Sequence, residues 1–343
     1  MDFGKEVVNW YLENKRDLPW RNTRDPFKIW LSEVLLQQTK VEQGTSYYLK
    51  FIARFANVQE LAQASEQEIL KLWQGLGYYS RARNLHYASQ QIVTQYSGSF
   101  PTNYKELLKL KGVGEYTAGA IASICYNEKV AIVDGNVYRV LSRFLSIDTP
   151  IDTTTGKREF KAIAQLLLEN NNPSHFNQGI MELGATICTP KQPNCATCPL
   201  QKACSSFAKN NILEYPVKAK KTKQKKRFFN YLVLRTPNDS FYIEKRKDKD
   251  IWQNMYQFPL IETNSETNSL HLEDTIISTK SAVIYNAPKH ILSHQIIYTK
   301  FWEFRINETF LKNNKQWILI NKNDISQYPF PKLIDNYIQE RIL

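Results

Sequence analysis

Hydrophobic side chains recur at helical spacing through the first part of the chain. In the segment 27–35 they fall three and four residues apart, which places them on one face of a helix. This apolar stripe consists of Phe27, Trp30, Leu31, Val34 and Leu35. Segments 61–73, 82–93 and 160–168 repeat the spacing, with Gly, Pro and Ser-Gly breaks between them. The pattern predicts a mainly helical domain over residues 1–213.

The pattern changes beyond residue 227. Several segments there are rich in β-branched and aromatic residues, as strands are. These segments are residues 228–234, 241–245, 282–285 and 296–306. Residues 331–343 are expected to form a closing helix. We therefore expect an α+β domain over residues 228–343.

A basic segment separates the two predicted domains. Seven of the ten residues from Lys218 to Arg227 are Lys or Arg, and little in this segment could be buried. We interpret residues 214–227 as a linker. Its charge suits a phosphate backbone, but a solvated tether without contacts explains it equally well.

Composition narrows the class of protein. Of the 343 residues, 42% are hydrophobic and 23% are charged, which is typical of globular chains. No apolar run approaches the ~20 residues of a membrane span, and the first residues lack an apolar secretory core. These features argue against a membrane protein or a secreted disulfide scaffold and favour a cytoplasmic location. The net charge of +12 predicts a polyanionic partner, nucleic acid first, although a basic surface can also serve solubility alone.

Four of the five cysteines lie close together in the sequence. They are Cys188, Cys195, Cys198 and Cys204. Because the chain shows no secretory signal, thiols at this spacing favour a metal over disulfides. Four thiolates suit either zinc or an iron–sulfur cluster, and the ligand type alone does not choose between them. Cys125 stands alone in an apolar stretch and is expected to be a buried structural residue.

Two short segments combine a turn with the start of a helix. Residues 107–118 predict a helix, a turn at Gly112 and Gly114, and a second helix, which would present backbone N–H groups to a DNA phosphate. An ordinary helix–helix turn would have the same sequence pattern. Asp134 follows an apolar run and precedes a helical stretch over 137–145, so taken alone it is a helix N-cap.

Taken together, these segments resemble the helix-hairpin-helix DNA glycosylases with an iron–sulfur loop, the endonuclease III superfamily. Within it the chain resembles the adenine DNA glycosylases of the MutY type, which remove adenine mispaired with 8-oxoguanine. Besides the four-cysteine loop, the segments that carry the resemblance are residues 18–21 (LPWR), 32–39 (SEVLLQQT), 75–83 (GLGYYSRAR), 112–118 (GVGEYTA) and 133–137 (VDGNV).

The resemblance implies a role for each residue of the catalytic motifs. Glu33 would protonate adenine N7, which requires a dry pocket that raises its proton affinity. Asp134 would stabilise positive charge on the sugar, directly or through a covalent intermediate. Tyr116 and Asn136 would orient these groups. In lyase-competent relatives a lysine occupies the position of Tyr116, so little or no strand cleavage is expected. The alternative for Glu33 is a solvated helix carboxylate.

The resemblance also implies residues that contact the displaced base and the duplex. Trp20 and Arg21 would line the adenine pocket, and Thr39 would contact DNA. Gln38, Leu76 and Tyr78 would wedge into the duplex, at a site where unstacking costs a few kcal/mol. For Leu76 and Tyr78 the alternative is a place in the core of a helix–turn.

The second domain resembles the Nudix-like 8-oxoguanine-reading domain of this family. Residues 251–259 match its early motif, and because the sequence has no Glu-rich hydrolase box, nucleotide hydrolysis is not expected. The family's Phe-Ser-His loop corresponds to Leu292, Ser293 and His294. Ser293 and His294 would donate hydrogen bonds to the lesion, whereas an ordinary surface histidine is the alternative for His294.

The resemblance therefore implies one 4Fe-4S cluster, mainly structural, held by the four clustered cysteines. It implies a monomer that binds double-stranded DNA with adenine opposite 8-oxoguanine or guanine, in the cytoplasm and associated with the nucleoid. Two alternatives stay open: an endonuclease III-like glycosylase/lyase for oxidised pyrimidines, and a catalytically silent DNA-binding redox sensor. Tyr116 and the long second domain argue against the lyase, and the presence of both carboxyl residues argues against the silent binder.

Overall fold

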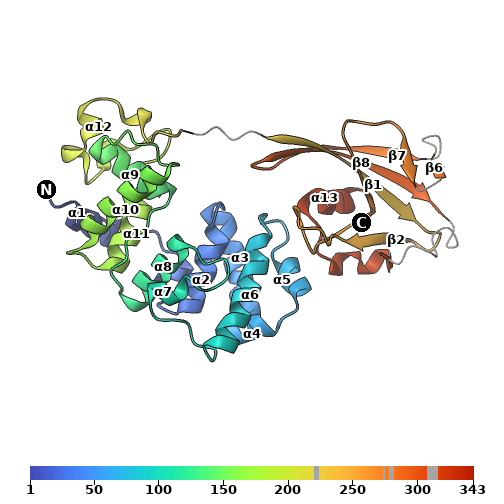
Figure 1. The fold of residues 1–343 in the computed structure, drawn as a ribbon, viewed down its shortest axis with the longest axis horizontal. Helices are drawn as coiled ribbons and strands as arrows, with labels where there is room; N and C mark the ends of the chain where they lie inside the picture. The colour runs from blue at the N-terminus through green and yellow to red at the C-terminus, as the bar shows by residue number, and fades with distance from the viewer. Residues whose placement is uncertain (220–223, 273–274, 278–281, 307–315) are drawn as a thin grey trace. The chain divides into compact units, whose positions relative to one another are not determined.

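The chain folds as two compact units (Figure 1). The computed structural model describes residues 1–219, 224–272, 275–277, 282–306 and 316–343. Unit 1 contains Met1–Gln63 and Asn84–Lys220, and unit 2 contains Ala64–Arg83 and Lys221–Leu343. Among the described residues, no helix is long and apolar enough to cross a membrane. The predicted domain limits stay a prediction, and the assignment of segment 64–83 to unit 2 was not anticipated from the sequence.

Unit 1 is helical (Figure 1). Helix α11 packs against α1, α8 and α9, and α2 packs against α3 and α8. The longer helices that fall in unit 1 are α1 (Phe3–Asn14), α2 (Pro26–Leu36), α3 (Val41–Arg54), α4 (Val58–Gln63), α6 (Ser80–Gln95, whose first turn belongs to unit 2), α8 (Glu115–Tyr126), α9 (Gly135–Leu145), α10 (Thr154–Leu168) and α11 (Pro173–Thr186). The short ones are η1 (Pro19–Asn22), α7 (Tyr104–Leu107), η2 (Cys195–Thr197), η3 (Gln201–Ala203), α12 (Ser205–Ala208) and η4 (Ile212–Glu214).

The predicted helices of the first domain are confirmed with one correction. Helices α2, α6, α8, α9 and α10 cover the expected segments. The segment 61–73 does not form one helix, because it divides between α4 and α5 (Glu66–Leu72). The side chain of Ser65 accepts a hydrogen bond from the backbone N–H of Glu68 and so starts α5 anew. The Ser-x-x-Glu pattern that marks such a start was present in the sequence.

An apolar core in unit 1 joins helices α1, α9, α10 and α11. These helices contribute most of its buried side chains, among them Val7, Leu141, Phe160 and Ile180. Burial of such side chains stabilises the unit by about 1.5–3 kcal/mol each relative to exposure. The core therefore fixes the start of α9 and one face of α11 relative to each other.

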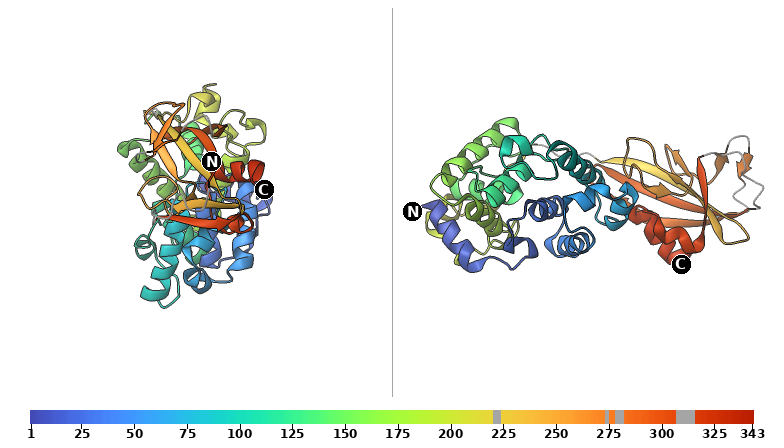
Figure 2. Two further views of the ribbon diagram at one scale, coloured as in Figure 1. Left: turned by 90° about the vertical axis from the view of Figure 1, so that its right-hand side faces the viewer. Right: turned by 90° about the horizontal axis from the view of Figure 1, so that it is seen from below.

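Unit 2 is built on a mixed sheet with strand order β3-β2-β1-β8-β7, in which β4 pairs with β1 and β9 pairs with β2. Strands β1 and β8 are parallel and the other pairs are antiparallel. Helix α13 (Lys332–Arg341) lies against the sheet (Figure 2), where Tyr337 stacks on Phe301 with ring centroids 3.9 Å apart. The strands are β1 (Lys225–Arg235), β2 (Ser240–Lys245), β3 (Tyr256–Gln257), β4 (Leu260–Thr263), β7 (Val283–Ile291), β8 (Gln295–Arg305) and β9 (Trp317–Asn321), and a separate pair consists of β5 (Leu270–Leu272) and β6 (Thr275–Ile277).

The predicted strands and the closing helix are confirmed, but the end of the basic segment is not a linker. Strand β1 begins at Lys225. The Arg227 side chain is 11% exposed and pairs with Asp250 and Glu262, each at 2.7 Å. Its charge is thus matched by acids far along the chain, which a local count of basic residues could not show. Residues 220–223 of the predicted linker lie outside the described residues.

Candidate active site

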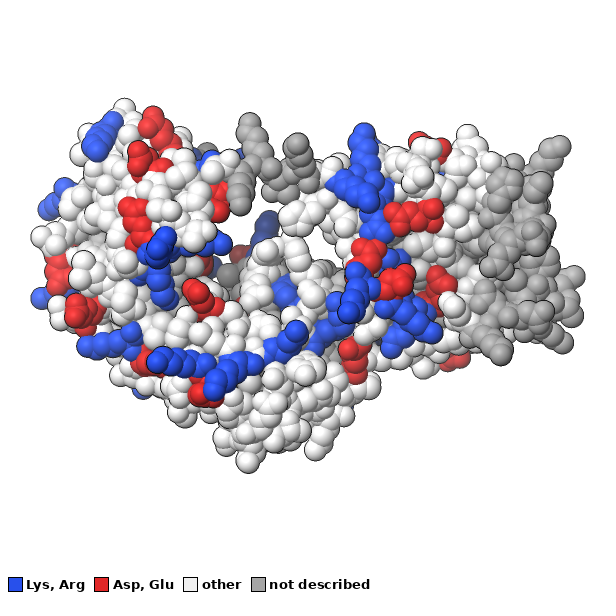
Figure 3. Space-filling model, viewed as in Figure 1, with Lys and Arg blue, Asp and Glu red and all other residues white. Residues whose placement is uncertain are grey.

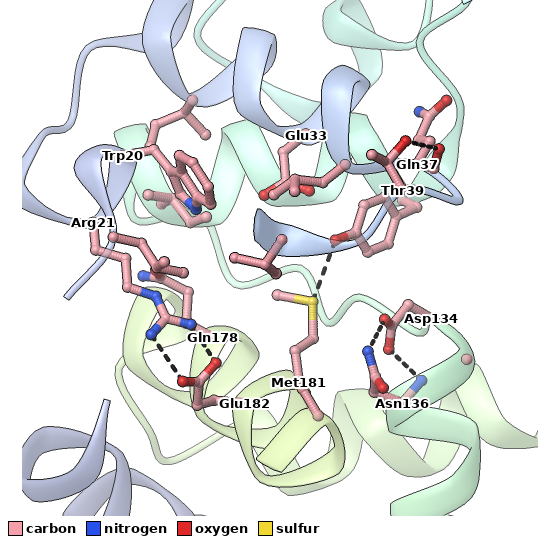
Figure 4. A pocket seen from close by; sticks show the side chains of 18 of the residues that line it. Trp20, Arg21, Glu33, Gln37, Thr39, Asp134, Asn136, Gln178, Met181 and Glu182 are labelled. Carbon is pink, nitrogen blue, oxygen red and sulfur yellow. Dashed lines mark hydrogen bonds and ion pairs between the residues drawn. The ribbon is translucent and has the colours of Figure 1, made fainter. Parts of the chain in front are cut away.

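A pocket of about 570 Å³ opens within unit 1 (Figure 4). Its walls come from η1, α2, α8, the start of α9, and α11. Most of the polar residues predicted from the first domain's motifs line it: Trp20, Arg21, Glu33, Gln38, Thr39, Tyr116, Asp134 and Asn136. The chain thus brings together side chains from segments far apart in the sequence.

Glu33 lies on the buried side of α2. The helix begins with Pro26 and is capped by the Asp25 side chain, which accepts a hydrogen bond from the N–H of Phe27. Burial raises the pKa of Glu33 to about 7, and the nearby Asp134 carboxylate also raises it, whereas a hydrogen bond with Tyr116 and the charge of Arg21 lower it. A side chain only 8% exposed is not the solvated carboxylate of the alternative interpretation. Near neutral pH a substantial fraction of Glu33 carries a proton.

Asp134 lies in the same pocket but in a different electrostatic environment. It caps α9, and its Oδ1 accepts hydrogen bonds from the N–H groups of Asn136 at 2.9 Å and Val137 at 2.8 Å. Its Oδ2 accepts a third from Asn136 Nδ2 at 2.7 Å (Figure 4). Burial raises the pKa of Asp134 above its ordinary value, and these hydrogen bonds and the charge of Arg139 offset only part of that rise. Asp134 is therefore both the N-cap expected from its position and a pocket residue.

Tyr116 and Asn136 contact further polar groups. The Tyr116 hydroxyl donates to Met181 Sδ at 3.3 Å and also hydrogen-bonds with Glu33. Burial, with the two nearby carboxyls, raises the pKa of Tyr116 well above 10, so its phenol stays neutral. Asn136 Oδ1 accepts from Arg139 Nη2 at 2.8 Å, which fixes the amide that donates to Asp134.

The four pocket residues on α11 were missed in the sequence: Gln178, Met181, Glu182 and Ala185. The side chain of Glu182 is 1% exposed and forms ion pairs with two arginines. Arg16 Nε lies 2.7 Å from Glu182 Oε1, and Arg21 Nη2 lies 2.5 Å from Glu182 Oε2. Burial raises the pKa of Glu182, but the bonds from the arginines outweigh it and hold the pKa at about 2. A possible signal was a carboxylate at a core position of an apolar helix, between Ile180 and Leu183.

The predicted glycine turn is confirmed between α7 and α8, but its two glycines differ. Gly112 has a φ of +76°, in the left-handed region that favours glycine. A Cβ there would also lie 2.6 Å from the Cβ of Asn84. Gly114 has a φ of −91°, caps α8, and has open space around it. Only Gly112 is thus needed for the turn itself, and neither glycine lines the pocket of unit 1.

Leu76, Tyr78, Ser293 and His294 lie together in unit 2, around a second pocket of about 460 Å³. The Tyr78 hydroxyl hydrogen-bonds with the Ser293 hydroxyl. Leu76 is 7% exposed, which agrees with the alternative of a core residue, whereas Tyr78 is 45% exposed. Gln38, expected to act with Leu76 and Tyr78, lines the pocket of unit 1 instead.

The four clustered cysteines line one small cavity in unit 1 of about 30 Å³. None forms a disulfide, and burial together with the neighbouring cysteines raises the pKa of Cys195 and of Cys198. Arg143 donates to Cys188 Sγ at 3.4 Å. Within the described ranges, no three His, Cys, Asp or Glu side chains are already placed to hold a metal ion. Cys125 does not line this cavity and is half-buried rather than fully buried.

Comparison with known proteins gives matches over both parts of the chain. The model of the HhH-GPD superfamily base excision DNA repair proteins matches residues 31–165, and that of the NUDIX domain matches residues 230–340. The adenine DNA glycosylase of Buchnera aphidicola subsp. Schizaphis graminum is 36% identical over 314 residues, which cover 91% of this chain and 89% of that protein. The human adenine DNA glycosylase is 42% identical over 211 residues, 59% of this chain and 39% of that protein.

Solved structures resemble the helical part. A thermostable thymine-DNA glycosylase is 30% identical with a TM-score of 0.56, covering 60% of this chain and 95% of its own. A trapped endonuclease III–DNA covalent intermediate shares the fold, with 22% identity and a TM-score of 0.53 over 60% of this chain and 94% of its own. The helical unit with this pocket thus belongs to the HhH-GPD superfamily of base excision DNA repair proteins. Within that superfamily, the chain belongs to the adenine DNA glycosylase family.

The family confirms the resemblance and the fold class expected from the sequence: a helix-hairpin-helix glycosylase domain followed by a Nudix-like α+β domain. The chain is accordingly a DNA N-glycosylase. Neither the endonuclease III-like lyase for oxidised pyrimidines nor the catalytically silent redox sensor is favoured by these relatives.

Proposed function

We propose that this enzyme hydrolyses the N-glycosidic bond of adenine opposite 8-oxoguanine or guanine in duplex DNA, without cutting the strand. The observation that carries the proposal is the contrast between two buried carboxyls in one pocket. Burial raises the pKa of Glu33 to about 7. Among the causes of this shift, Tyr116 is the one hydrogen-bond partner that opposes burial. Burial also raises the pKa of Asp134, but this carboxyl accepts three hydrogen bonds that favour its ionised form. Such a pair supplies one acid and one carboxylate at the same pH.

The chemistry follows from that assignment. The carboxylic acid of Glu33 gives its proton to adenine N7, and the electron pair of the glycosidic bond leaves with the base. The sugar then has oxocarbenium character, and the negative charge of Asp134 stabilises it, directly or through a covalent adduct that water opens. Water supplies the hydroxyl at the sugar carbon, and its second proton returns to a carboxylate. Asn136 orients Asp134 through its amide.

Tyr116 supports a glycosylase without strand-cutting activity. A lyase needs an amine that forms a Schiff base with the sugar, and a phenol cannot form one. The high pKa of Tyr116 also keeps it from acting as an anionic nucleophile. We therefore assign Tyr116 an orienting role beside Glu33.

Adenine must leave the base stack to enter the pocket of unit 1, which costs a few kcal/mol. Trp20, Arg21, Gln38 and Thr39 line that pocket and are proposed to hold the displaced base and the adjacent strand. The Trp20 indole is buried and packs edge-on against Tyr48, so it offers a fixed wall. Arg21 is oriented by its two bonds to Glu182.

Unit 2 supplies the groups proposed to recognise the opposite base. Ser293 and His294 can donate hydrogen bonds to 8-oxoguanine, and the exposed ring of Tyr78 can stack in the duplex beside them. Leu76 is proposed to support this wedge from its buried position. Leu292 stands where the family carries an aromatic residue, so less stacking is available to this loop.

The four cysteines are proposed to hold one 4Fe-4S cluster with a mainly structural role. Thiols that all line one cavity, without disulfides, fit the donor set of such a cluster. Arg143 can donate a hydrogen bond to a cysteine sulfur while its other N–H groups hold the carbonyls of Thr189 and Pro190. When bound, the cluster would brace the loop 188–204.

Phosphate contacts are proposed for the glycine turn, with Gly112 and Gly114 bringing backbone N–H groups close to the strand. On the face shown in Figure 3, each unit carries Lys and Arg side chains with acidic residues between them. With a net charge of +12, the protein is expected to bind duplex DNA as a monomer in the cytoplasm, associated with the nucleoid.

The test is single-turnover adenine release from duplexes with adenine opposite 8-oxoguanine, guanine, cytosine or thymine, with and without alkali. Release should be fastest opposite 8-oxoguanine, and strand breaks should require alkali. Glu33→Gln should lower the rate by about 10²–10⁴-fold while duplex binding persists. Glu13→Gln, on the exposed side of α1, is the matched control. Unchanged release by Glu33→Gln, or breaks without alkali, would refute the proposal.

A further inference from the structure

The single proton of the Tyr116 hydroxyl has two acceptors within reach. One is Met181 Sδ on α11, at 3.3 Å, and the other is the Glu33 carboxyl on α2. The proton can satisfy only one of them at a time. We propose that Met181 is a positioning residue that holds this proton while Glu33 is in its acid form, and thereby favours the protonated general acid. The inference rests on the proposed function, because it assigns Glu33 the role of acid.

The geometry gives a chain of three groups. The Tyr116 hydroxyl donates to the Met181 sulfur (Figure 4), and Tyr116 is also within hydrogen-bond reach of the Glu33 carboxyl. While the Tyr116 proton is on the sulfur, the acid form of Glu33 is free to donate to the Tyr116 oxygen. A thioether is a weak acceptor, and it carries no proton of its own that could compete for the phenol oxygen. Met181 is held in place because it packs against the core of unit 1. An apolar side chain of the same size would leave the Tyr116 proton no alternative to Glu33.

The same arrangement acts after proton transfer. When Glu33 has given its proton to adenine N7, it is a carboxylate, and the Tyr116 hydroxyl can rotate from the sulfur to donate to it. Tyr116 loses no proton in this exchange, and its high pKa keeps it neutral throughout. Met181 thus stabilises the acid before the step, and Tyr116 stabilises the carboxylate after it.

Other titratable or charged groups also face Glu33 or share its pocket, and a substitution at Met181 leaves all of them in place. They are Arg21 from η1, Cys125 from α8, Asp134 from the start of α9, and Glu182 from α11, which is paired with Arg16 and Arg21. If the titration midpoint of Glu33 shifts when the Met181 sulfur is removed, the shift is therefore due to loss of the sulfur as a hydrogen-bond acceptor.

The experiment is the pH profile of single-turnover adenine release by Met181→Leu. Loss of the acceptor should move the high-pH midpoint of the profile down by about half a pH unit. The rate above pH 7.5 should fall by about threefold, while the rate at low pH stays close to wild type. Met181→Gln restores an acceptor, so its midpoint should return to or exceed the wild-type value. Met255→Leu, a buried methionine of unit 2, is the matched control.

A structural role for Met181 would not depend on the Tyr116 hydroxyl. In a Tyr116→Phe background, Met181→Leu should therefore cause no further shift. The Glu33 carboxyl signal of ¹³C-labelled protein, titrated without substrate, gives the same midpoint in variants too slow for kinetics. An unchanged midpoint in Met181→Leu, or an equal shift in both backgrounds, would overturn the inference. Retained release by Glu33→Gln would instead refute the proposed function.

Discussion

The balance between burial and the hydrogen-bond donors and charges around each carboxyl sets its proton affinity in the pocket of unit 1. Glu182 accepts bonds from two arginines, and its pKa is held at about 2. Asp134 accepts three bonds from the start of α9. Glu33 shares only the Tyr116 hydroxyl and the attraction of Arg21, too little to offset burial. The three carboxyls of one pocket therefore differ in proton affinity because of their immediate neighbours.

Removal of the charge of Glu182 should destabilise unit 1 strongly. In Glu182→Gln, Arg21, whose side chain is 9% exposed, keeps a buried charge without a counter-charge. We expect the free energy of unfolding to fall by about 3 kcal/mol, measured by urea denaturation at pH 7. Arg16→Gln removes a partner whose side chain is 37% exposed and should cost less than half as much. Equal losses in the two variants would contradict this account.

The ion pairs of Glu182 with Arg16 and Arg21 also make the stability of unit 1 depend on pH. Because the pKa of Glu182 is about 2 in the folded state and near 4.5 when unfolded, its contribution to stability is complete above pH 4.5. It is lost as the pH falls from 4.5 towards 2. The stability difference between wild type and Glu182→Gln should therefore shrink over that window.

Motif residues were predictable at this scale because each lies in a recognisable local segment. Glu33, Tyr116, Asp134 and Asn136 all reach one pocket, as expected. Glu182 was not predicted, since its partners Arg16 and Arg21 lie 166 and 161 positions away in sequence. Met181 was missed for the same reason, because only the packing of α11 against α8 brings its sulfur to Tyr116.

At the scale of elements, the start of helix α9 contributes both to the stability of unit 1 and to its pocket. Its N-cap is Asp134, so the same carboxylate satisfies the first N–H groups of the helix and faces the pocket. Asparagine caps helices about as well as aspartate, whereas alanine does not. The two roles of Asp134 can therefore be separated by substitution.

Asp134→Asn and Asp134→Ala should differ in stability but not in activity. Asp134→Asn keeps the cap, so its thermal unfolding should stay within a few tenths of a kcal/mol of wild type, while Asp134→Ala should lose about 1 kcal/mol. Both remove the negative charge proposed to stabilise the sugar, so both should slow adenine release by at least about 10²-fold. The readouts are calorimetry and single-turnover kinetics. If Asp134→Asn released adenine at the wild-type rate, Asp134 would act only as the N-cap of α9 and have no role in the reaction.

Elements were predictable where one local signal dominates. The apolar stripe predicted α2, and β-branched and aromatic runs predicted β1 and β8. The break within segment 61–73 was missed because its apolar spacing continues across the Ser65 cap. The basic segment was assigned to a linker through residue 227, because the ion pairs of Arg227 with β4 and Asp250 are long-range.

At the scale of the whole molecule, the chain does not divide at one point. Segment 64–83 joins unit 2, where Glu66 Oε1 accepts from Asn254 Nδ2 at 2.7 Å and Lys71 Nζ donates to the carbonyl of Tyr328 at 3.2 Å. Such contacts exist only in the folded chain, so no boundary read from composition could reveal them. The segment carries Leu76 and Tyr78 to the loop of Ser293 and His294. Unit 2 thus combines Leu76 and Tyr78, two of the three residues proposed to wedge into the duplex, with the groups proposed to read the lesion, while unit 1 holds Gln38 and the proposed chemistry.

This division predicts that discrimination and chemistry can be lost separately. Ser293→Ala and His294→Ala each remove one proposed hydrogen bond to 8-oxoguanine and leave the pocket of unit 1 intact. Each should lower the ratio of adenine release opposite 8-oxoguanine to release opposite guanine by about 3–10-fold, with the rate opposite guanine nearly unchanged. Leu292→Phe should raise the ratio, because an aromatic ring adds stacking on the lesion. Ser265→Ala, at an exposed serine of unit 2, is the matched control.

The ratio separates this prediction from a general loss of binding. If Ser293 only holds Tyr78 through their shared hydrogen bond, Ser293→Ala and Tyr78→Phe should lower both rates alike and leave the ratio unchanged. If Ser293 reads the lesion, only the rate opposite 8-oxoguanine should fall, and Tyr78→Phe should differ from it. A joint loss of both rates in Ser293→Ala and His294→Ala would place the loop among the duplex-binding groups. Recognition of 8-oxoguanine would then have to come from other residues.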